Sequence, residues 1–336
     1  MNMSRVKFGL RLPTREPLIY PETISLDQVL DLAVEAELGG FDSVWVGDSI
    51  LSKHRYEAVT ILGAVAAKTS KVKLGTCCMS TFPLRHPVLT AYQWATLDQL
   101  SRGRTILAVC MGGASRGTAG DYLHEYENLG VDYTKRAKIL EENIKIITAL
   151  WTGEKITYHG QFHKLTAATL EPKPYQKPRP PIWLVSNPQP FDPANERVQK
   201  ALQRVARLAD GWMTTNITPV QLRQGLNIIA DERLRWSLSA KGFEAAFAYN
   251  INVNDDEEKG FMESKDFLER FYMKKFSTET INSWVAYGRP DRCIKKLEEY
   301  IDAGATVIPL RITSPNQKEA LKRIVDEILP SFNKNY

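Results

Sequence analysis

Short apolar runs alternate with longer amphipathic segments from one end of the chain to the other. The short runs, such as FDSVWVG at Phe41–Gly47, have the length and the β-branched and aromatic content of buried strands. Eight of them occur, and each is followed by a segment of helical periodicity. The predicted strands are Val6–Leu12, Phe41–Gly47, Val72–Cys78, Arg104–Met111, Pro181–Val185, Gly211–Thr215, Ala245–Val253 and Thr306–Arg311.

The amphipathic segments predict one helix after each strand. Ser25 stands where an N-cap is expected, and Pro87 stands in a first turn, where its missing N–H costs nothing. The predicted helices are Ser25–Leu38, Tyr56–Thr69, Pro87–Leu100, Tyr133–Trp151, Asn195–Leu208, Val220–Leu238, Asp291–Ala303 and Gln317–Leu329. Eight strand–helix units favour an α/β fold, a (β/α)₈ TIM barrel formed by residues 1–336 as a single domain. An open doubly wound sheet with a cap domain is the alternative.

Three insertions interrupt this alternation: Gly113–Asp132 after strand four, Thr152–Pro180 before strand five and Asn254–Arg289 after strand seven. The first and third lie on the barrel face where active sites form. The second predicts a small hairpin that turns at His159-Gly160. The third is rich in aromatic residues and Met, which fits either a lid over the site or plain helix packing.

Composition narrows the class of protein. The 44 Lys and Arg against 39 Asp and Glu are interspersed, unlike the basic patch of a nucleic-acid-binding protein. No apolar run reaches the ~18 residues of a membrane span, and the first residues do not resemble a signal peptide. The four cysteines lack the spacing of a metal site, and the simplest expectation is reduced thiols in a cytoplasmic protein.

The predicted strand ends carry little acid–base chemistry. They offer no lysine for a Schiff base, no carboxylate–histidine cluster for a metal, and one carboxylate, Asp48. Small and apolar residues predominate, as at Cys110-Met111-Gly112. A site of this kind favours a bound organic cofactor that performs the chemistry.

Several ordered motifs resemble one known family. They include GFDSVWVGD (residues 40–48), SKVKLGT (70–76), PLRHP (83–87), ATLDQLSRGRTILAVCMG (95–112), RAKILEENIKIITALWTG (136–153), PPIWLV (180–185) and ARLADGW (206–212). Their order and spacing resemble the luciferase-like flavin monooxygenases and their deazaflavin-dependent relatives. The resemblance implies a flavin across the barrel mouth and a homodimer.

The resemblance also implies cofactor contacts. Relatives often have a cis non-proline peptide at the end of strand three, which falls on Thr76-Cys77-Cys78. The end of strand four would hold the ring and ribityl chain, and the end of strand five the phosphate, although turn chemistry alone also explains Ser186-Asn187. Arg116 would replace a phosphate-binding Arg of some relatives. The predicted cofactor-binding residues are Thr76, Cys77, Met111, Gly112, Ser186 and Asn187.

Three residues are candidates for catalysis: Asp48, His86 and Cys110. Asp48 would orient the cofactor ring, or else cap a turn. His86, within PLRHP, would face the mouth, or else anchor a loop. Cys110 corresponds to a cysteine near the flavin in the luciferases, or is a buried structural residue. Where many relatives carry a histidine after the strand-two carboxylate, this chain has Ser49.

Three functions remain open at this level. The main prediction is a two-component monooxygenase that uses O₂ and reduced FMN from a separate flavin reductase on a small organic substrate. An apolar mouth containing Trp45 and Met111 would protect the oxygenating species from water. The first alternative is a dehydrogenase or reductase that transfers hydride with an 8-hydroxy-5-deazaflavin coenzyme. The second is a flavin-binding protein without catalysis.

Overall fold

Parallel strands occupy eight positions around a closed barrel in the computed structural model, which describes residues 5–113 and 122–333. The first strand pairs with the last, Lys7 opposite Val307, and this pairing closes the barrel. The predicted (β/α)₈ barrel is therefore confirmed. The strands are β1 (Lys7–Arg11), β2 (Ser43–Val46), β3 (Lys73–Thr76), β4 (Thr105–Val109), β7 (Ile182–Val185), β8 (Gly211–Thr214), β9 (Glu244–Phe247) with β10 (Tyr249–Val253), and β12 (Val307–Ile312).

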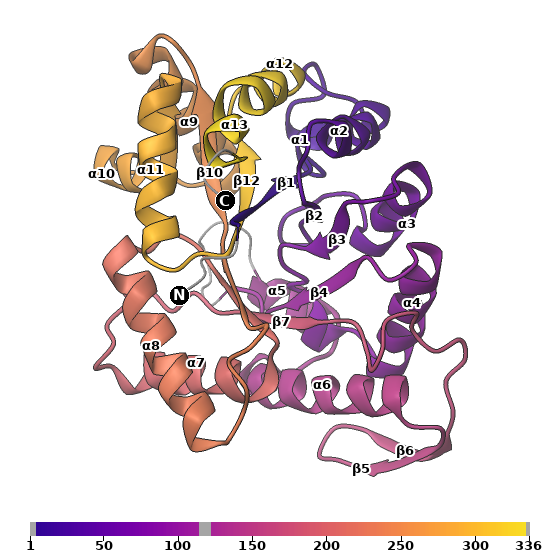
Figure 1. The fold of residues 1–336 in the computed structure, drawn as a ribbon. Helices are drawn as coiled ribbons and strands as arrows, with labels where there is room; N and C mark the ends of the chain where they lie inside the picture. The colour runs from indigo at the N-terminus through magenta and orange to yellow at the C-terminus, as the bar shows by residue number, and fades with distance from the viewer. Residues whose placement is uncertain (1–4, 114–121, 334–336) are drawn as a thin grey trace.

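Helices surround the strands, as Figure 1 shows. Ser25 caps α2 as predicted, since its hydroxyl accepts the Gln28 N–H and the Gln28 side chain accepts the Ser25 N–H. The surrounding helices are α2 (Leu26–Leu38), α3 (Ala58–Lys68), α4 (Pro87–Leu100), α6 (Arg136–Thr152), α7 (Glu196–Leu208), α8 (Pro219–Arg235), α11 (Pro290–Asp302) and α12 (Gln317–Arg323). The last continues through a π-helical turn (Ile324–Ile328) into α13 (Leu329–Asn333).

At the seventh strand position, the sequence predicts one strand, whereas the structure has two. It is interrupted at Ala248, and its halves β9 and β10 both pair with β12. The insertion that follows forms α9 (Glu257–Tyr272), α10 (Thr278–Trp284) and a further parallel strand, β11 (Val285–Gly288), beside β10. Phe267 and Trp284 of this insertion pack in an apolar cluster with Tyr20. The insertion thus packs as a layer beside the barrel, and its Phe271 and Tyr272 also border a cavity at the carboxyl ends of the strands.

The other two insertions are smaller. The predicted hairpin is confirmed as antiparallel β5 (Ile156–His159) and β6 (Lys164–Ala168), but His159, expected in the turn, ends β5 opposite Lys164, and the turn begins at Gly160. In the insertion after β4, residues 122–128 form α5 (Tyr122–Asn128). Across residues 5–113 and 122–333, no helix is long and apolar enough to cross a bilayer.

The barrel interior is filled by two indole rings. Trp45 and Trp183 lie with ring centroids 5.3 Å apart, among Ala108, Met213 and Val307. Trp45 is fully buried and lines a cavity at the amino ends of the strands. The expectation that Trp45 faces the mouth is therefore wrong, because the indole lies toward the amino end of β2, where its Nε1 donates to Ser43 Oγ at 2.8 Å.

Glycine on the neighbouring strand makes room for this ring. A Cβ on Gly75 of β3 would overlap the six-membered ring of Trp45. We expect Gly75→Ala to lower the free energy of unfolding by about 1–3 kcal/mol, because a filled core rearranges at that cost. Urea unfolding followed by tryptophan fluorescence measures the change.

Gly63→Ala in α3 is the matched control. Nothing lies within 4 Å of a Cβ built on Gly63, and alanine is the better helix former by ~1 kcal/mol. The control variant should equal or exceed the wild type in stability. Equal stability of Gly75→Ala and the wild type would contradict the packing described here.

Candidate active site

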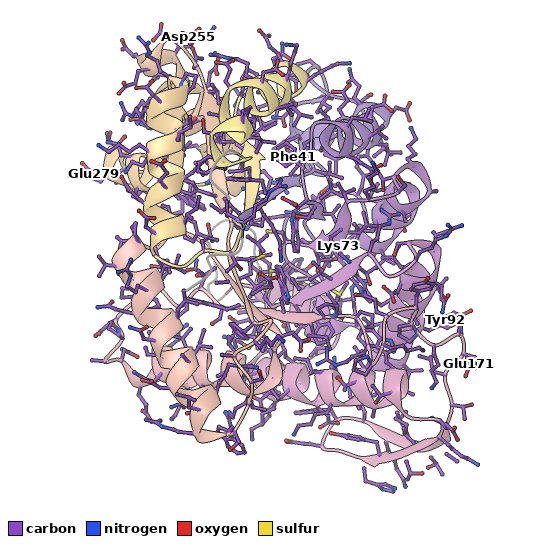
Figure 2. All side chains as sticks on the ribbon, in the orientation of Figure 1. Phe41, Lys73, Tyr92, Glu171, Asp255 and Glu279 are labelled. Atoms are coloured by element: carbon purple, nitrogen blue, oxygen red, sulfur yellow. A yellow bond between two sulfur atoms is a disulfide. The ribbon has the colours of Figure 1, made fainter. Side chains whose placement is uncertain are left out.

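A cavity of about 390 Å³ opens at the carboxyl ends of the barrel strands. A larger cavity, about 670 Å³, lies at the opposite end, where Phe41 and Lys73, both labelled in Figure 2, are among its lining residues. Active sites of such barrels form where the strands end, because the loops that follow them converge there. The smaller cavity is therefore the candidate active site.

The structure brings most of the predicted site residues together. Their side chains or backbone come from the ends of β2, β3, β4 and β7, and all border this one cavity. Those that line it are Asp48, Cys77, Cys110, Met111, Gly112, Ser186 and Asn187. Their roles toward a cofactor or substrate stay predictions. Arg116 lies outside the described residues.

Two predicted site residues lie elsewhere. Thr76 is fully buried, and its hydroxyl donates to the Ala108 carbonyl at 2.6 Å, so it ties β3 to β4 and does not line the cavity. His86 is exposed at the N-cap of α4, where its Nδ1 accepts the Val88 N–H. Its ring packs edge-on against His163 near the β5–β6 hairpin. The expectation that His86 faces the mouth is therefore wrong, since capping turns the ring away.

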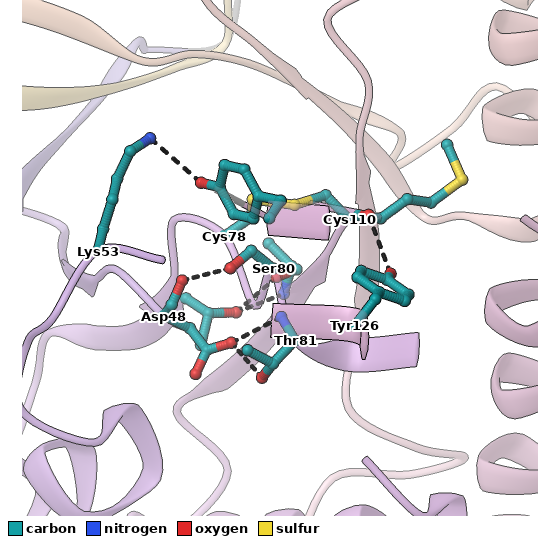
Figure 3. The surroundings of a disulfide bond; sticks show 11 residues. Asp48, Lys53, Cys78, Ser80, Thr81, Cys110 and Tyr126 are labelled. Atoms are coloured by element: carbon teal, nitrogen blue, oxygen red, sulfur yellow. Dashed lines mark hydrogen bonds between the residues drawn. A yellow bond between two sulfur atoms is a disulfide. The ribbon is translucent and has the colours of Figure 1, made fainter. Parts of the chain in front are cut away.

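Asp48 borders the cavity, but its carboxylate is already engaged (Figure 3). One oxygen accepts the Thr81 N–H at 2.9 Å and the Thr81 hydroxyl at 2.5 Å. The other accepts from Arg85 Nη2 at 2.8 Å, and the side chain is only 2% exposed. Asp48 therefore positions the segment after β3.

The cysteines at the ends of β3 and β4 differ in part from their prediction. The Cys77–Cys78 peptide is cis, as the resemblance implied. Cys78 forms a disulfide with Cys110, with Cα atoms 6.2 Å apart (Figure 3). The expectation of reduced thiols is wrong for this pair, because adjacent parallel strands end side by side although 32 residues separate the cysteines. Cys110 therefore offers no free thiol here, whereas Cys77 does.

The sequence shows a mild net positive charge that could serve an anionic cofactor or substrate, but it does not show that basic residues gather in this cavity. Only Arg11 and Arg311 lie at predicted strand ends; the other basic residues come from loops and helices. The basic residues that line the cavity are Arg11, Lys53, Arg55, Arg136, Arg197 and Arg311. Asp48 is the one acidic residue among the described lining residues, and Arg85 already neutralises it. The described part of the cavity is thus strongly cationic.

The positive charge of the cavity lowers the pKa of Tyr272, which belongs to the third insertion. The Tyr272 hydroxyl accepts from Arg311 Nη1 at 3.1 Å, and Lys53 Nζ lies 4.8 Å from the ring centroid. Burial opposes ionisation of the phenol, but Arg311, then Arg11 and Lys53, outweigh it and lower the pKa of Tyr272 to about 8. Tyr272 therefore ionises at a lower pH than an ordinary tyrosine does.

A carboxylate of α5 holds the loop after β2 in place. One Glu125 oxygen accepts the N–H groups of Ile50 and Leu51, at 2.5 and 2.9 Å, and the other accepts the Ser52 hydroxyl at 2.9 Å. Glu125 is only 1% exposed. The same loop continues into Lys53, whose ammonium donates to the Tyr122 hydroxyl at 3.2 Å. The loop after β2 and α5 are thus locked together at the edge of the cavity.

A closed parallel barrel with a cavity of this size, little acid–base chemistry and a cationic lining can accommodate an anionic organic cofactor such as a flavin or deazaflavin. The family model described as luciferase-like monooxygenase matches residues 6–272. The chain belongs to this luciferase-like family of oxidoreductases.

Individual relatives refine the comparison. An F420-dependent glucose-6-phosphate dehydrogenase of Nakamurella multipartita is 26% identical over 92% of this chain and 93% of its own. Two solved structures share the fold with a TM-score of 0.79 and cover 97% of this chain and 99% of theirs. One is an F420-dependent secondary alcohol dehydrogenase with an F420–acetone adduct, 20% identical, and the other is the monooxygenase RslO1 of Streptomyces bottropensis, 19% identical.

Proposed function

We propose that this protein transfers hydride between the deazaflavin F420 and a small organic substrate, as a dehydrogenase or reductase. The observation that carries the proposal is the charge of the cavity: its described lining contains six basic side chains and one neutralised carboxylate. Such a field attracts an anionic cofactor and an anionic substrate. The similarity to an F420-dependent dehydrogenase over nearly the whole chain supports the same choice.

The residues of the cavity fit a deazaflavin. Cys77, Met111 and Met213 provide a weakly polar wall for the ring, and Gly112-Gly113 have no side chains to obstruct it. Ser186, Asn187 and Arg197, at the end of β7 and the start of α7, would hold the phosphate. When bound, the deazaflavin would supply a carbon that accepts or donates hydride.

The monooxygenase prediction receives less support from this chain. It depended on an apolar mouth that shields an oxygenating species, with Trp45 as part of that mouth. Trp45 lies at the other end of the barrel, and arginine and lysine side chains take up much of the cavity wall instead. A deazaflavin that exchanges hydride without oxygen has no such requirement for an apolar shield.

Cofactor binding tests the proposal. Purified protein is titrated separately with oxidised F420 and with FMN, and quenching of each cofactor's fluorescence gives the two dissociation constants. We expect F420 to bind at least about tenfold more tightly, a difference of ~1.4 kcal/mol. A panel of secondary alcohols and sugar phosphates, with loss of the long-wavelength F420 absorbance as the signal, then tests hydride transfer.

Two variants make the titration specific to this cavity. Arg197→Met should weaken F420 binding, because the lost charge borders the predicted phosphate site. Arg223→Met is the matched control, since Arg223 is exposed on α8 and donates to the Asp302 carbonyl away from the cavity. Tighter binding of FMN, with oxygen consumption when the flavin is reduced, would favour the monooxygenase and overturn the proposal.

A further inference from the structure

Three arginines meet on one side of the cavity. Arg11 ends β1, Arg311 lies in β12 beside it, and Arg55 comes from the loop after β2. We propose that Arg11, Arg55 and Arg311 form a binding site for an oxyanion of the substrate, a carboxylate or a phosphate ester. The assignment to the substrate rests on the proposed function, whereas the oxyanion site itself does not.

Arg311 and Arg55 are held in place without an acidic partner. Arg311 is only 6% exposed; its guanidinium carbon lies 3.9 Å from the Phe271 ring centroid, and Nη1 donates to the Tyr272 hydroxyl. The Arg55 guanidinium lies 5.7 Å from the same centroid, and its Nε donates to the Lys53 carbonyl. Fixed donors that face a cavity are what recognition of an oxyanion requires.

No ion pair within the described part of the chain neutralises their charge, and Glu16 and Asp48 offset it only in part, from a greater distance. No carboxylate oxygen of residues 5–113 or 122–333 lies within ion-pair distance of these three guanidinium groups. Glu16, buried nearby, uses its carboxylate to accept the Arg15 N–H. Uncompensated buried charges of like sign destabilise one another, and a bound anion relieves that repulsion. The cluster formed by Arg11, Arg55 and Arg311 therefore favours a ligand of opposite charge.

Gly47, at the end of β2, makes room for one of the three arginines, Arg55. A Cβ on Gly47 would overlap Arg55 Nη1, so the guanidinium lies directly against the backbone at this position. The backbone and the Arg55 side chain thus form one preorganised unit. Gly47→Ala moves Arg55 without removing its charge, and this separates placement from net charge in an experiment.

The position of the cluster separates it from the predicted cofactor phosphate site. In the closed strand order, β12 and β1 lie opposite β4 and β7. The cluster is on the β12–β1 side, whereas Met111, Ser186 and Asn187 follow β4 and β7. A cofactor with its phosphate on the β7 side leaves the cluster available to the second reactant. The anion recognised there accordingly belongs to the substrate.

Tyr272 reports on occupancy of the cluster. Of the charged groups that face it, Arg311, Arg11 and Lys53 lower its pKa to about 8, and Phe276 and Trp284, which pack on its ring, are uncharged. An anion among the arginines offsets their effect, so binding raises the pKa of Tyr272. By linkage, anion affinity is highest when the phenol is neutral and falls as pH rises through about 8.

The test uses inorganic phosphate and acetate as probes, with sodium chloride at equal ionic strength as the control. The phenolate absorbance of Tyr272 is isolated as the difference between wild-type and Tyr272→Phe spectra and followed across pH. We expect phosphate, acetate or both to move its midpoint upward from about 8, and chloride to move it much less. The more effective probe indicates a phosphate ester or a carboxylate in the substrate.

Substitutions test whether the shift of the Tyr272 midpoint arises from anion binding at the cluster. Arg311→Met and Gly47→Ala should each weaken probe binding at least tenfold, measured by calorimetry, whereas Arg223→Met should not. Absence of a midpoint shift with both probes, or unchanged affinity in Gly47→Ala and Arg311→Met, overturns the oxyanion site. If Arg311→Met does not fold, the probe affinity of Gly47→Ala alone tests the oxyanion site, because this variant retains every ionisable group.

The same titration with F420 bound identifies the source of the anion. If F420 leaves probe affinity unchanged, the site faces the substrate, as proposed. Competition between F420 and the probe assigns the cluster to the cofactor's own anion and overturns the inference. A probe-induced shift in a protein that does not bind F420 would refute the proposed function and leave the oxyanion site intact, so the two failures are distinguishable.

Discussion

We expect Gly112→Val to weaken F420 binding by about 10- to 100-fold. Gly112 lines the cavity with φ +69°, a region that β-branched residues avoid, and its Cβ would lie 3.2 Å from the Tyr122 ring. Holding a side chain there costs about 1–3 kcal/mol, and each 1.4 kcal/mol is tenfold in affinity. The loop would relax away from this conformation and have to regain it on binding. Fluorescence titration with F420 measures the loss.

Gly130→Val is the matched control for Gly112→Val. Gly130 has φ +68°, but nothing lies within 4 Å of a Cβ built there, and it does not line the cavity. The control carries the same backbone strain and should lower stability without altering F420 affinity. Equal F420 affinities for Gly112→Val and the wild type would show that the end of β4 does not contact the cofactor.

The second large effect is expected from Asp48→Ala. Loss of the carboxylate leaves Arg85 without its buried partner and leaves the Thr81 N–H and hydroxyl without an acceptor. Removal of one partner of a buried ion pair typically costs about 3–5 kcal/mol. Since Arg85 keeps Glu57 at 3.0 Å, the lower end of that range is expected. Urea unfolding of Asp48→Ala and the wild type measures this loss in the free energy of unfolding.

Asp31→Ala tests whether the loss reflects burial. Asp31 pairs with Lys68 at 3.2 Å, and its side chain is 61% exposed. Exposed pairs contribute about 0–1 kcal/mol, and alanine favours the helix, so this variant should stay close to the wild type. A loss of less than about 1 kcal/mol for Asp48→Ala would contradict a positioning role for this carboxylate.

The barrel was predictable because its signal is local and repeated. Periodicity placed α4 at Pro87–Leu100 to the residue and located every strand position. The interruption at Ala248 was not visible, because alternation along Ala245–Val253 is the same for one strand or two. Strand ends converge by topology alone, and for this reason Met111, Gly112 and Ser186 were found at the cavity.

The rest of the site depends on contacts between distant segments. Cys78 and Cys110 meet only because their strands are adjacent, and no spacing rule predicts that pair. Tyr272 reaches the mouth from an insertion whose own packing had to be known first. His86 was misplaced because its motif does not show that its ring caps α4.

The three hydrogen bonds that Glu125 accepts from residues 50–52 have a consequence for protein engineering. They join two segments that are about 70 residues apart, 75 for Ile50 and Glu125, into one structural unit. Grafting either segment alone from a homologue leaves buried donors or a buried carboxylate without partners. Chimeras that aim at a new substrate should exchange both segments together, and homologues should vary them as a matched pair.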